Sequence, residues 1–291
     1  GFDVYIRDLL VIGREAYYLE PADPRYTGEL LRGPIDPGGF LCYTPWAANY
    51  KVISNCQTIL NSADADAGAK GFAQTVNAYC LMRVLNLTDT NGARLNYDGD
   101  ITAAVATKAE VLTEIESLLD AGLANLNSAG SAFSFTLSSG FDGFNTPSTF
   151  AHFNRGLRAR TAVHQDDWDA AQAALTACAD WMNSADGDVG VYHVFSSGAN
   201  DGDNQMYEDP NAATLKLMVH PTFLTDADSG DARVTNNILV RENTVTYDGL
   251  STNLAPTLYS GTYDAVPMMR SEELKLLQAE VHIGNSNYSG A

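Results

Sequence analysis

The sequence predicts a mainly α-helical protein, built from paired amphipathic helices that carry one large irregular insertion. Three observations lead to this fold class. Apolar side chains recur at helical spacing over residues 45–60 and 69–87. A second pair of helical patterns occupies residues 148–163 and 166–183. Residues 184–265 are instead rich in Gly, Asp, Asn and Pro, which indicates turns, loops and a few short strands.

The first helix pair shows the clearest pattern. Residues 45–60 place Trp46, Tyr50 and Ile53 on one face. Pro45 is expected in the first helical turn, where its missing N–H has no intrahelical acceptor to lose. A short polar segment joins this helix to the next. Because neither helix can bury its apolar stripe alone, we expect the two to pack antiparallel as a hairpin.

The second helix pair has the character of a tetratricopeptide repeat. Trp168 precedes Ala171 by three residues, and Leu175 continues the same stripe. A bulky side chain beside a small one is typical of the close helix crossings in such repeats.

The rest of the chain follows from similar patterns. We expect helices at residues 1–18, 102–126 and 271–283, and long loops at 19–43 and 128–147. The whole is expected to form a single domain. Its helical scaffold covers about 1–183 and 266–291, and its irregular, ligand-bearing part covers about 184–265.

Composition excludes several classes of function. The net charge of −19 argues against nucleic acid as a partner, because phosphates would be repelled. No apolar run is long enough to span a membrane, and no leader pattern opens the chain, so we expect a mature or trimmed fragment. The cysteines form no CxxC pair, and Cys56, Cys80 and Cys178 are expected to be buried thiols. A disulfide between Cys42 and Cys56 stays open.

Four blocks of sequence, in order, carry a resemblance to a known family. The first is W-x-x-x-Y-x-x-I, matched by Trp46, Tyr50 and Ile53. The second is GFAQTVNAYCLMRVL, in which Phe72 and Asn77 replace the usual Glu and Arg. The third is the helix pair at 153–175. The fourth block is matched by Pro267, Arg270, Glu273, Leu274, Leu277, Ala279 and Glu280. The chain resembles the SusD/RagB family of glycan-binding outer-membrane lipoproteins, as a divergent member.

The resemblance implies a SusD-like, tetratricopeptide-like α-α superhelix without catalytic activity. Such a protein captures oligosaccharides or peptides at the cell surface and delivers them to a SusC-like TonB-dependent transporter. The family's lipid-bearing N-terminal cysteine and C-terminal tail are not in this chain. Two alternatives stay open: a tetratricopeptide scaffold that binds a protein partner, and a glycoside hydrolase. Neither an HExxH nor a G-x-S-x-G motif is present, and chance pairs are expected among 36 acidic residues.

Sugar binding requires flat aromatic faces together with side chains that hydrogen-bond to hydroxyl groups. We expect the ligand surface to form where the loop at 19–43 meets the irregular part. The candidate ligand-binding residues are Arg25, Tyr26, Arg32, Tyr43, Tyr207, Tyr247, Tyr259 and Tyr263.

No cofactor is expected, although two acidic stretches are candidates for calcium. Asp201 and Asp203 lie in one stretch, and Asp226 and Asp228 lie in the other. Neither has the full spacing of a calcium loop, so solvated turn acids are the alternative interpretation.

Overall fold

The computed structural model describes residues 1–97, 99–100, 102–199 and 201–290. The chain divides into two compact units. Unit 1 comprises Gly1–Pro45 and Val194–Val266, and unit 2 comprises Trp46–His193 and Pro267–Ala291. Helices dominate and the strands are few and short, so the predicted fold class is confirmed.

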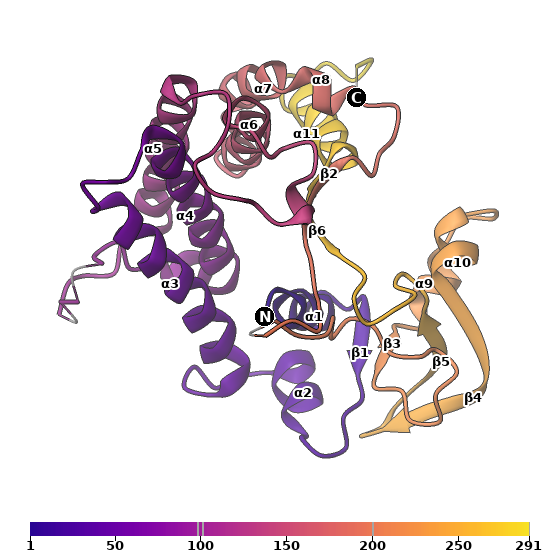
Figure 1. The fold of residues 1–291 in the computed structure, drawn as a ribbon. Helices are drawn as coiled ribbons and strands as arrows, with labels where there is room; N and C mark the ends of the chain where they lie inside the picture. The colour runs from indigo at the N-terminus through magenta and orange to yellow at the C-terminus, as the bar shows by residue number, and fades with distance from the viewer. Residues whose placement is uncertain (98, 101, 200, 291) are drawn as a thin grey trace. The chain divides into compact units, whose positions relative to one another are not determined.

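Unit 2 is the helical scaffold, in which successive helices pack against one another (Figure 1). Its main helices are α4 (Ala67–Thr88), α5 (Lys108–Ser128), α6 (Pro147–Val163), α7 (Trp168–Ala177) and α11 (Ser271–Gly284). Each of the first four packs on the next, and α11 closes the unit against α6 and α7. The smaller elements are α8 (Ala179–Met182), the paired strands β2 (Gly190–His193) and β6 (Val266–Arg270), and 3-10 turns at Asp89–Asn91 and Ser139–Phe141.

Side-chain caps set where these helices begin. The Asp66 carboxylate accepts a hydrogen bond from the Ala69 amide at 2.7 Å and starts α4. Thr107 and Glu110 form a capping box, so α5 begins at Lys108 and the prediction of a helix from residue 102 was wrong. The single helix predicted at 166–183 is also wrong, because it breaks at Cys178 into α7 and α8.

The first helix of the predicted pair at 45–60 and 69–87 is α3 (Phe40–Leu60). It begins five residues earlier than predicted, with Pro45 inside it. Proline there leaves one carbonyl without its usual N–H partner. Within unit 2, Ile53 is fully buried, and the Tyr50 hydroxyl donates to the Arg94 carbonyl at 3.0 Å. The predicted helix is therefore present, but the residue at which it starts was predicted wrongly.

All four cysteines are free thiols. Cys42 and Cys56 lie on the same helix, about 21 Å apart at 1.5 Å of rise per residue, which excludes the disulfide between them. Burial raises the pKa of the Cys56 thiol to about 11. A thiol that stays protonated at neutral pH is a poor nucleophile, so Cys56 acts as a packing residue.

The three tryptophans differ in burial. Trp181 is 4% exposed, and its indole N–H donates to the Val189 carbonyl at 2.8 Å. Trp46 and Trp168 are only half-buried. The Trp168 ring occupies the space beside Gly284, where an added Cβ would lie 2.3 Å from it. Trp168 therefore packs against the end of α11 and lies at the margin of the core.

The segment between α5 and α6 lacks regular structure apart from one 3-10 turn, as predicted, but it supplies aromatic rings to the core. Phe72 of α4 lies at the centre of the cluster. Its ring centroid is 5.3 Å from that of Phe135 and 5.2 Å from that of Phe150. The phenylalanine that replaces the Glu of the second sequence block thus has a packing role in this chain.

The crossing of α4 and α5 depends on two glycines. A Cβ at Gly71 would lie 2.7 Å from Leu126 Cγ and 2.9 Å from the Gly122 carbonyl oxygen. A Cβ at Gly122 would lie 3.0 Å from Asn154 Nδ2. These helices approach so closely that no larger residue fits at Gly71 without a shift of the backbone.

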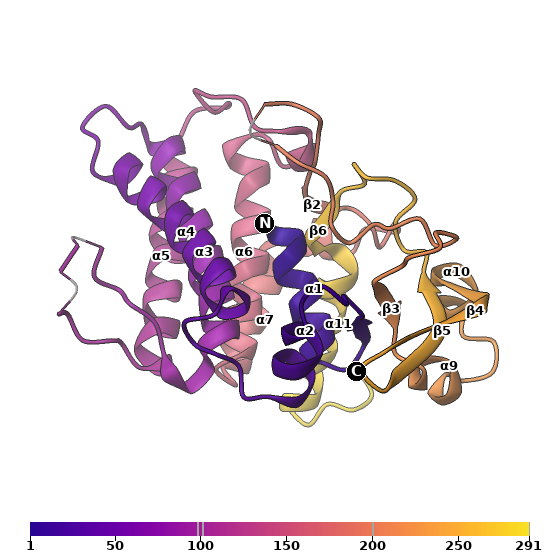
Figure 2. The same cartoon turned by 90° about the horizontal axis from the view of Figure 1, so that it is seen from below.

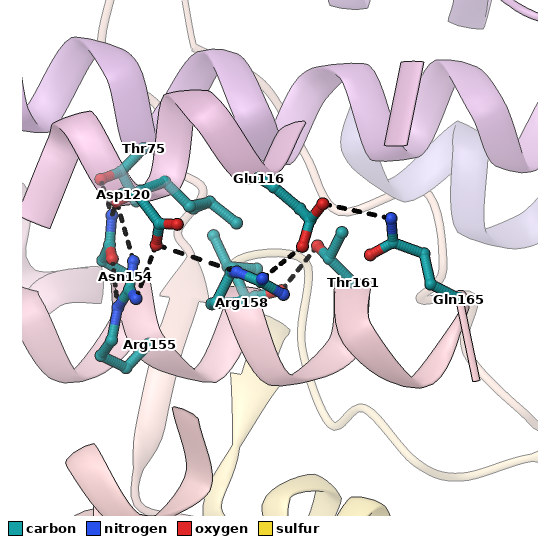
Figure 3. Close-up of polar contacts among 10 residues, drawn as sticks. Thr75, Glu116, Asp120, Asn154, Arg155, Arg158, Thr161 and Gln165 are labelled. Atoms are coloured by element: carbon teal, nitrogen blue, oxygen red, sulfur yellow. Dashed lines mark hydrogen bonds and ion pairs between the residues drawn. The ribbon is translucent and has the colours of Figure 1, made fainter. Parts of the chain in front are cut away.

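A buried polar network joins α4, α5 and α6 (Figure 3). Asn154 is fully buried, and its amide nitrogen donates to the Thr75 hydroxyl at 2.8 Å and to the Leu119 carbonyl at 3.0 Å. Arg155 donates to the Asn154 side-chain oxygen at 2.9 Å and pairs with Asp120 at 2.9 Å. Buried polar groups are costly when unpaired, so this network ties the three helices to a single arrangement.

The same network continues along α6. Arg158 forms an ion pair with Glu116, and the Gln165 amide donates to Glu116 at 3.3 Å. Figure 3 shows Arg158 reaching from α6, and Gln165 from the turn after it, toward Glu116 on α5. Nothing in the apolar spacing of the two helices predicts this row of contacts.

Unit 1 combines short helices with two small antiparallel sheets. Its elements are α1 (Phe2–Ile12), β1 (Ala16–Tyr18), α2 (Arg25–Thr27), a π-helical turn (Gly28–Arg32), β3 (Leu217–Val219), α9 (Thr222–Asp226), α10 (Ala232–Asn237), β4 (Ile238–Tyr247) and β5 (Leu250–Pro256). β1 pairs with β3, and β4 pairs with β5 through a hairpin (Figure 2). Their side chains share one apolar core that includes Val11, Leu217 and Met218.

Two predictions for this unit were wrong. The helix predicted at 1–18 ends at Ile12, because Ala16–Tyr18 is a fully buried strand paired with β3. The long loop predicted at 19–43 contains α2, the π-helical turn and the start of α3.

The division into units also assigns Gly1–Pro45 to the same unit as the irregular part, whereas the sequence placed these residues with the helical scaffold. The apolar side of α1 packs into the core shared with β3, which accounts for this assignment. The single-domain organisation stays a prediction. Among the described residues, no helix is both long and apolar enough to cross a bilayer.

Candidate ligand-binding site

The eight candidate ligand residues all lie in unit 1, so the two loop regions from which they were chosen belong to one compact unit. Tyr26, Tyr247 and Tyr259 pack half-buried against its core. The eight side chains have different environments, however, and only some are available to a ligand.

Arg25 and Tyr26 are engaged within the protein. Arg25 forms an ion pair with Asp23 at 2.6 Å, and its guanidinium carbon lies 4.4 Å above the Phe40 ring centroid. The Tyr26 ring packs edge-on against Phe40 at 5.6 Å, and its hydroxyl accepts a hydrogen bond from Arg7 at 3.4 Å. These contacts make both residues anchors of the loop that contains them.

Arg32 links the π-helical turn to the β4–β5 hairpin. It forms an ion pair with the Asp248 carboxylate and also donates to the Asp248 carbonyl at 2.8 Å. The Thr27 hydroxyl donates to the same carboxylate at 2.8 Å. The Arg32 hydrogen bond holds the pKa of Asp248 below its ordinary value. Asp248 and Gly249 both have positive φ, as a two-residue hairpin turn requires.

Replacing Asp248 by Asn tests this link. Asn tolerates the positive φ at this position but removes the charge that holds Arg32. We expect faster amide hydrogen exchange across residues 25–32 with an almost unchanged melting temperature. Asp226→Asn, at an exposed acid on α9, is the matched control. Unchanged exchange in D248N would show that the ion pair does not order this segment.

The remaining tyrosines are more accessible. Tyr43 is 58% exposed and Tyr263 is 50% exposed, whereas Tyr207 and Tyr247 are half-buried. None of these four lines the pocket described next, and their role as ligand residues stays a prediction.

Unit 1 contains a pocket of about 180 Å³, and of the eight candidates only Tyr259 lines it. The lining comes from α1, β1, β3, α9, α10, both strands of the hairpin and the segments beside them. It comprises Leu10, Glu15, Ala16, Met206, Leu217, Met218, Val219, Phe223, Asn237, Ile238, Pro256, Leu258 and Tyr259. The volume is below the roughly 300–1,000 Å³ of sites that enclose drug-sized ligands, so the pocket fits part of a larger ligand.

The β1–β3 pairing and the β4–β5 hairpin give the pocket its form. Ala16 pairs with Val219, and Ile238 pairs with Pro256 across the hairpin. Leu258 follows β5 and is 60% exposed, beside the half-buried ring of Tyr259. An apolar floor with an exposed apolar and aromatic rim is typical of sites that bind the C–H face of a ligand.

Two polar side chains interrupt the apolar lining. Glu15 is exposed, and among the described residues its carboxylate has neither an ion pair nor a hydrogen bond; only its backbone is engaged, with Leu10 and His220. The Asn237 side-chain amide is likewise unpaired within the described residues, while its carbonyl accepts from the Thr257 amide at 2.8 Å. A carboxylate and an amide provide acceptors and donors for the hydroxyl groups of a ligand.

Glu15, Phe223, Asn237 and Leu258 were not predicted. They come from segments far apart in the sequence that only the sheets bring together, and no local motif marks them. The Asp248-Gly249 pair was a usable signal, because Asp-Gly between alternating apolar residues predicts a two-residue hairpin and so the approach of β4 to β5.

The calcium candidates are exposed: Asp201, Asp203 and Asp228 lie in irregular segments, and Asp226 is the last residue of α9. Asp201 accepts from the Ser196 hydroxyl at 2.8 Å, and Asp226 accepts from the Thr225 hydroxyl at 3.2 Å. Across the described ranges, no three His, Cys, Asp or Glu side chains come close enough to hold a metal ion.

No protein-family model and no curated protein sequence matches this chain. Its structure is similar to solved structures of low sequence identity. A SusD/RagB family protein from Bacteroides thetaiotaomicron aligns with 98% of this chain and 64% of its own length, with a TM-score of 0.72 and 16% identity. A SusD-like carbohydrate-binding protein from Bacteroides vulgatus aligns with 100% of this chain and 67% of its own length, with a TM-score of 0.70 and 15% identity.

A laminarin-binding SusD-like protein aligns with 96% of this chain and 77% of its own length, with a TM-score of 0.65 and 14% identity. This chain thus spans about two thirds of the length of the first two structures. Over nearly all of its own length, the chain has the SusD-like fold that the four sequence blocks predicted.

Proposed function

We propose that this chain is a divergent SusD-like protein that binds oligosaccharides without cleaving them. The observation that carries the proposal is the SusD-like fold over almost the entire chain, since similar structures include proteins named as carbohydrate-binding and laminarin-binding. The unit 1 pocket supports it, because an aromatic ring, an unpaired carboxylate and an unpaired amide surround an apolar floor.

Binding without hydrolysis is the form of the proposal that the pocket supports best. Glycosidases of the common type place two carboxyl groups on either side of the scissile bond. Of the residues that the structure describes, Glu15 is the one that places a carboxylate in the lining of this pocket. A single acid can hold a hydroxyl group but cannot supply both the acid and the nucleophile or base.

Substitutions in the pocket test the proposal. A glycan array identifies the oligosaccharide that the unaltered chain binds, and calorimetry then compares variants. We expect Tyr259→Ala to weaken binding about tenfold, since loss of a stacked ring costs about 1.4 kcal/mol. Tyr259→Phe keeps the ring and should retain most of the affinity. Tyr288→Ala removes a tyrosine that is 73% exposed outside the pocket and is the matched control.

Two outcomes bear on the proposal. Equal affinities for Tyr259→Ala and Tyr288→Ala would place the sugar elsewhere on the chain. Silence of the array, together with release of sugar from a polysaccharide, would favour the hydrolase alternative instead.

We further propose that the chain acts at the outer-membrane surface, lipid-anchored, as the partner of a SusC-like TonB-dependent transporter. The support is the SusD-like fold and the four sequence blocks of that family. Affinity purification of the tagged, full-length protein from native outer membranes tests this, and recovery of a transporter barrel in stoichiometric amount is the expected result. Recovery of the bait alone under mild detergent would count against the partnership.

A further inference from the structure

The pocket of unit 1 has a lining that selects among sugars. Resting on the proposed sugar-binding function, we infer that it takes an uncharged sugar residue carrying an apolar substituent, such as the methyl group of a 6-deoxy sugar or of an acetamido group, and that it rejects acidic sugars. The preference follows from two properties of the lining, its small number of hydrogen-bonding side chains and the sign of its charge.

The first property concerns hydrogen bonds. Most of the lining side chains are aliphatic or aromatic, and Glu15 and Asn237 are the two with strong polar groups besides the Tyr259 hydroxyl. A plain hexose has a hydroxyl on almost every carbon, and each hydroxyl that enters the apolar floor loses its water without gaining a partner. A methyl group in the same position loses nothing and buries apolar surface against half-buried residues such as Phe223 and Ile238.

The second property concerns charge. Among the described residues, the only charged side chain in the lining is the Glu15 carboxylate, which would repel a uronate or another anionic group at short range. The described part of the chain places no Lys or Arg in the lining. The basic side chains elsewhere in unit 1 are already engaged, as five ion pairs with acids show: Arg7 with Asp8, Arg25 with Asp23, Arg32 with Asp248, Lys216 with Glu20 and Arg233 with Asp231.

The other two arginines of unit 1 donate to backbone carbonyls. Arg14 donates to the Leu31 carbonyl, and Arg241 donates to the Ala212 carbonyl at 2.6 Å. Among the described residues, none of these cations lines the pocket. An anion therefore gains no cationic partner from the described lining.

The test uses methyl glycosides that differ at one carbon. D-glucose, 6-deoxy-D-glucose and D-glucuronate carry CH₂OH, CH₃ and COO⁻ at C6, and N-acetyl-D-glucosamine changes C2. The corresponding D-galactose series keeps the comparison independent of the configuration at C4. Ligand-observed NMR titration of the full chain gives the affinities. In at least one series we expect the deoxy or acetamido sugar to bind about tenfold more tightly than the parent, and the uronate about tenfold more weakly.

Charge variants separate repulsion from a general loss of fit. Glu15→Gln should reduce the difference in affinity between glucuronate and glucose, because it removes the repelling charge and keeps the shape of the side chain. Glu242→Gln, at an exposed acid on β4 outside the lining, should leave that difference unchanged. If neither variant changed the difference in affinity between glucuronate and glucose, the electrostatic part of the inference would be overturned.

The outcomes distinguish the inference from the function on which it rests. Sugars that bind with no preference for the deoxy or acetamido form, or with a preference for the uronate, would overturn the inference while the sugar-binding function stands. Failure of every sugar in both series, with binding of an apolar peptide in the same pocket, would overturn both.

Discussion

Asn154→Ala is expected to lower the free energy of unfolding of unit 2 by about 3 kcal/mol. Asn154 is fully buried and connects three helices through its side chain. Its loss removes two donated hydrogen bonds and leaves Arg155 Nε, which donates to it at 2.9 Å, without that acceptor inside the protein. The truncation also leaves a small cavity in the tightly packed crossing near Gly122.

Urea denaturation followed by tryptophan fluorescence measures this effect selectively, because all three tryptophans lie in unit 2. Thr161→Val is the matched control. Thr161 is equally buried on the same helix, but its hydroxyl donates only to the Leu157 carbonyl of the preceding turn, at 2.9 Å. We expect that substitution to change stability by less than about 1 kcal/mol. Equal effects of the two substitutions would mean that the network contributes no more than a single local hydrogen bond.

The helices of this chain were predictable, whereas the polar contacts between them were not. Apolar spacing located α4, α6 and α11 almost to the residue, because each buries one stripe. Asn154 and Thr75 are far apart in the sequence, and a polar residue inside an apolar stripe gives no signal of its partner. The predicted start of a helix was wrong where a capping residue sets it, as at Thr107. The pairing of Thr107 with Glu110 is visible in the sequence as T-x-x-E.

The candidate site was predictable only in outline. The aromatic residues chosen from irregular segments lie in the unit that contains the pocket, and one of them, Tyr259, lines it. Arg25 and Arg32 looked equally available, because a sequence does not show that Asp23 and Asp248 neutralise them. Long-range strand pairing places Glu15 and Asn237 together, and such pairing leaves little trace in a local pattern.

Gly71→Leu is expected to lower the free energy of unfolding of unit 2 by about 3 kcal/mol, at the upper end of the cost of overpacking. The Cβ alone would lie 2.9 Å from the Gly122 carbonyl oxygen, and backbone cannot move aside as a flexible side chain can. The helices α4 and α5 would have to separate, which also strains the contacts of Thr75 with Asn154. Gly71→Ala should cost less, about 1 kcal/mol, because alanine's better helix propensity offsets part of the clash.

Comparing Gly71→Ala with Gly71→Leu shows whether the close approach of α4 and α5 excludes larger side chains at this position. Gly130→Leu, in the segment after α5, is the control, because a Cβ there would meet nothing within 4 Å. It should change stability by less than about 0.5 kcal/mol in the same fluorescence-monitored denaturation. Replacement of an ordinary helical glycine by alanine raises stability. If Gly71→Ala did so, the added Cβ would have to lie more than 2.9 Å from the Gly122 carbonyl oxygen, and α4 and α5 would have to be farther apart than they are in this structure. The close crossing of α4 and α5 would then be wrong, and so would the placement of Asn154 between the three helices.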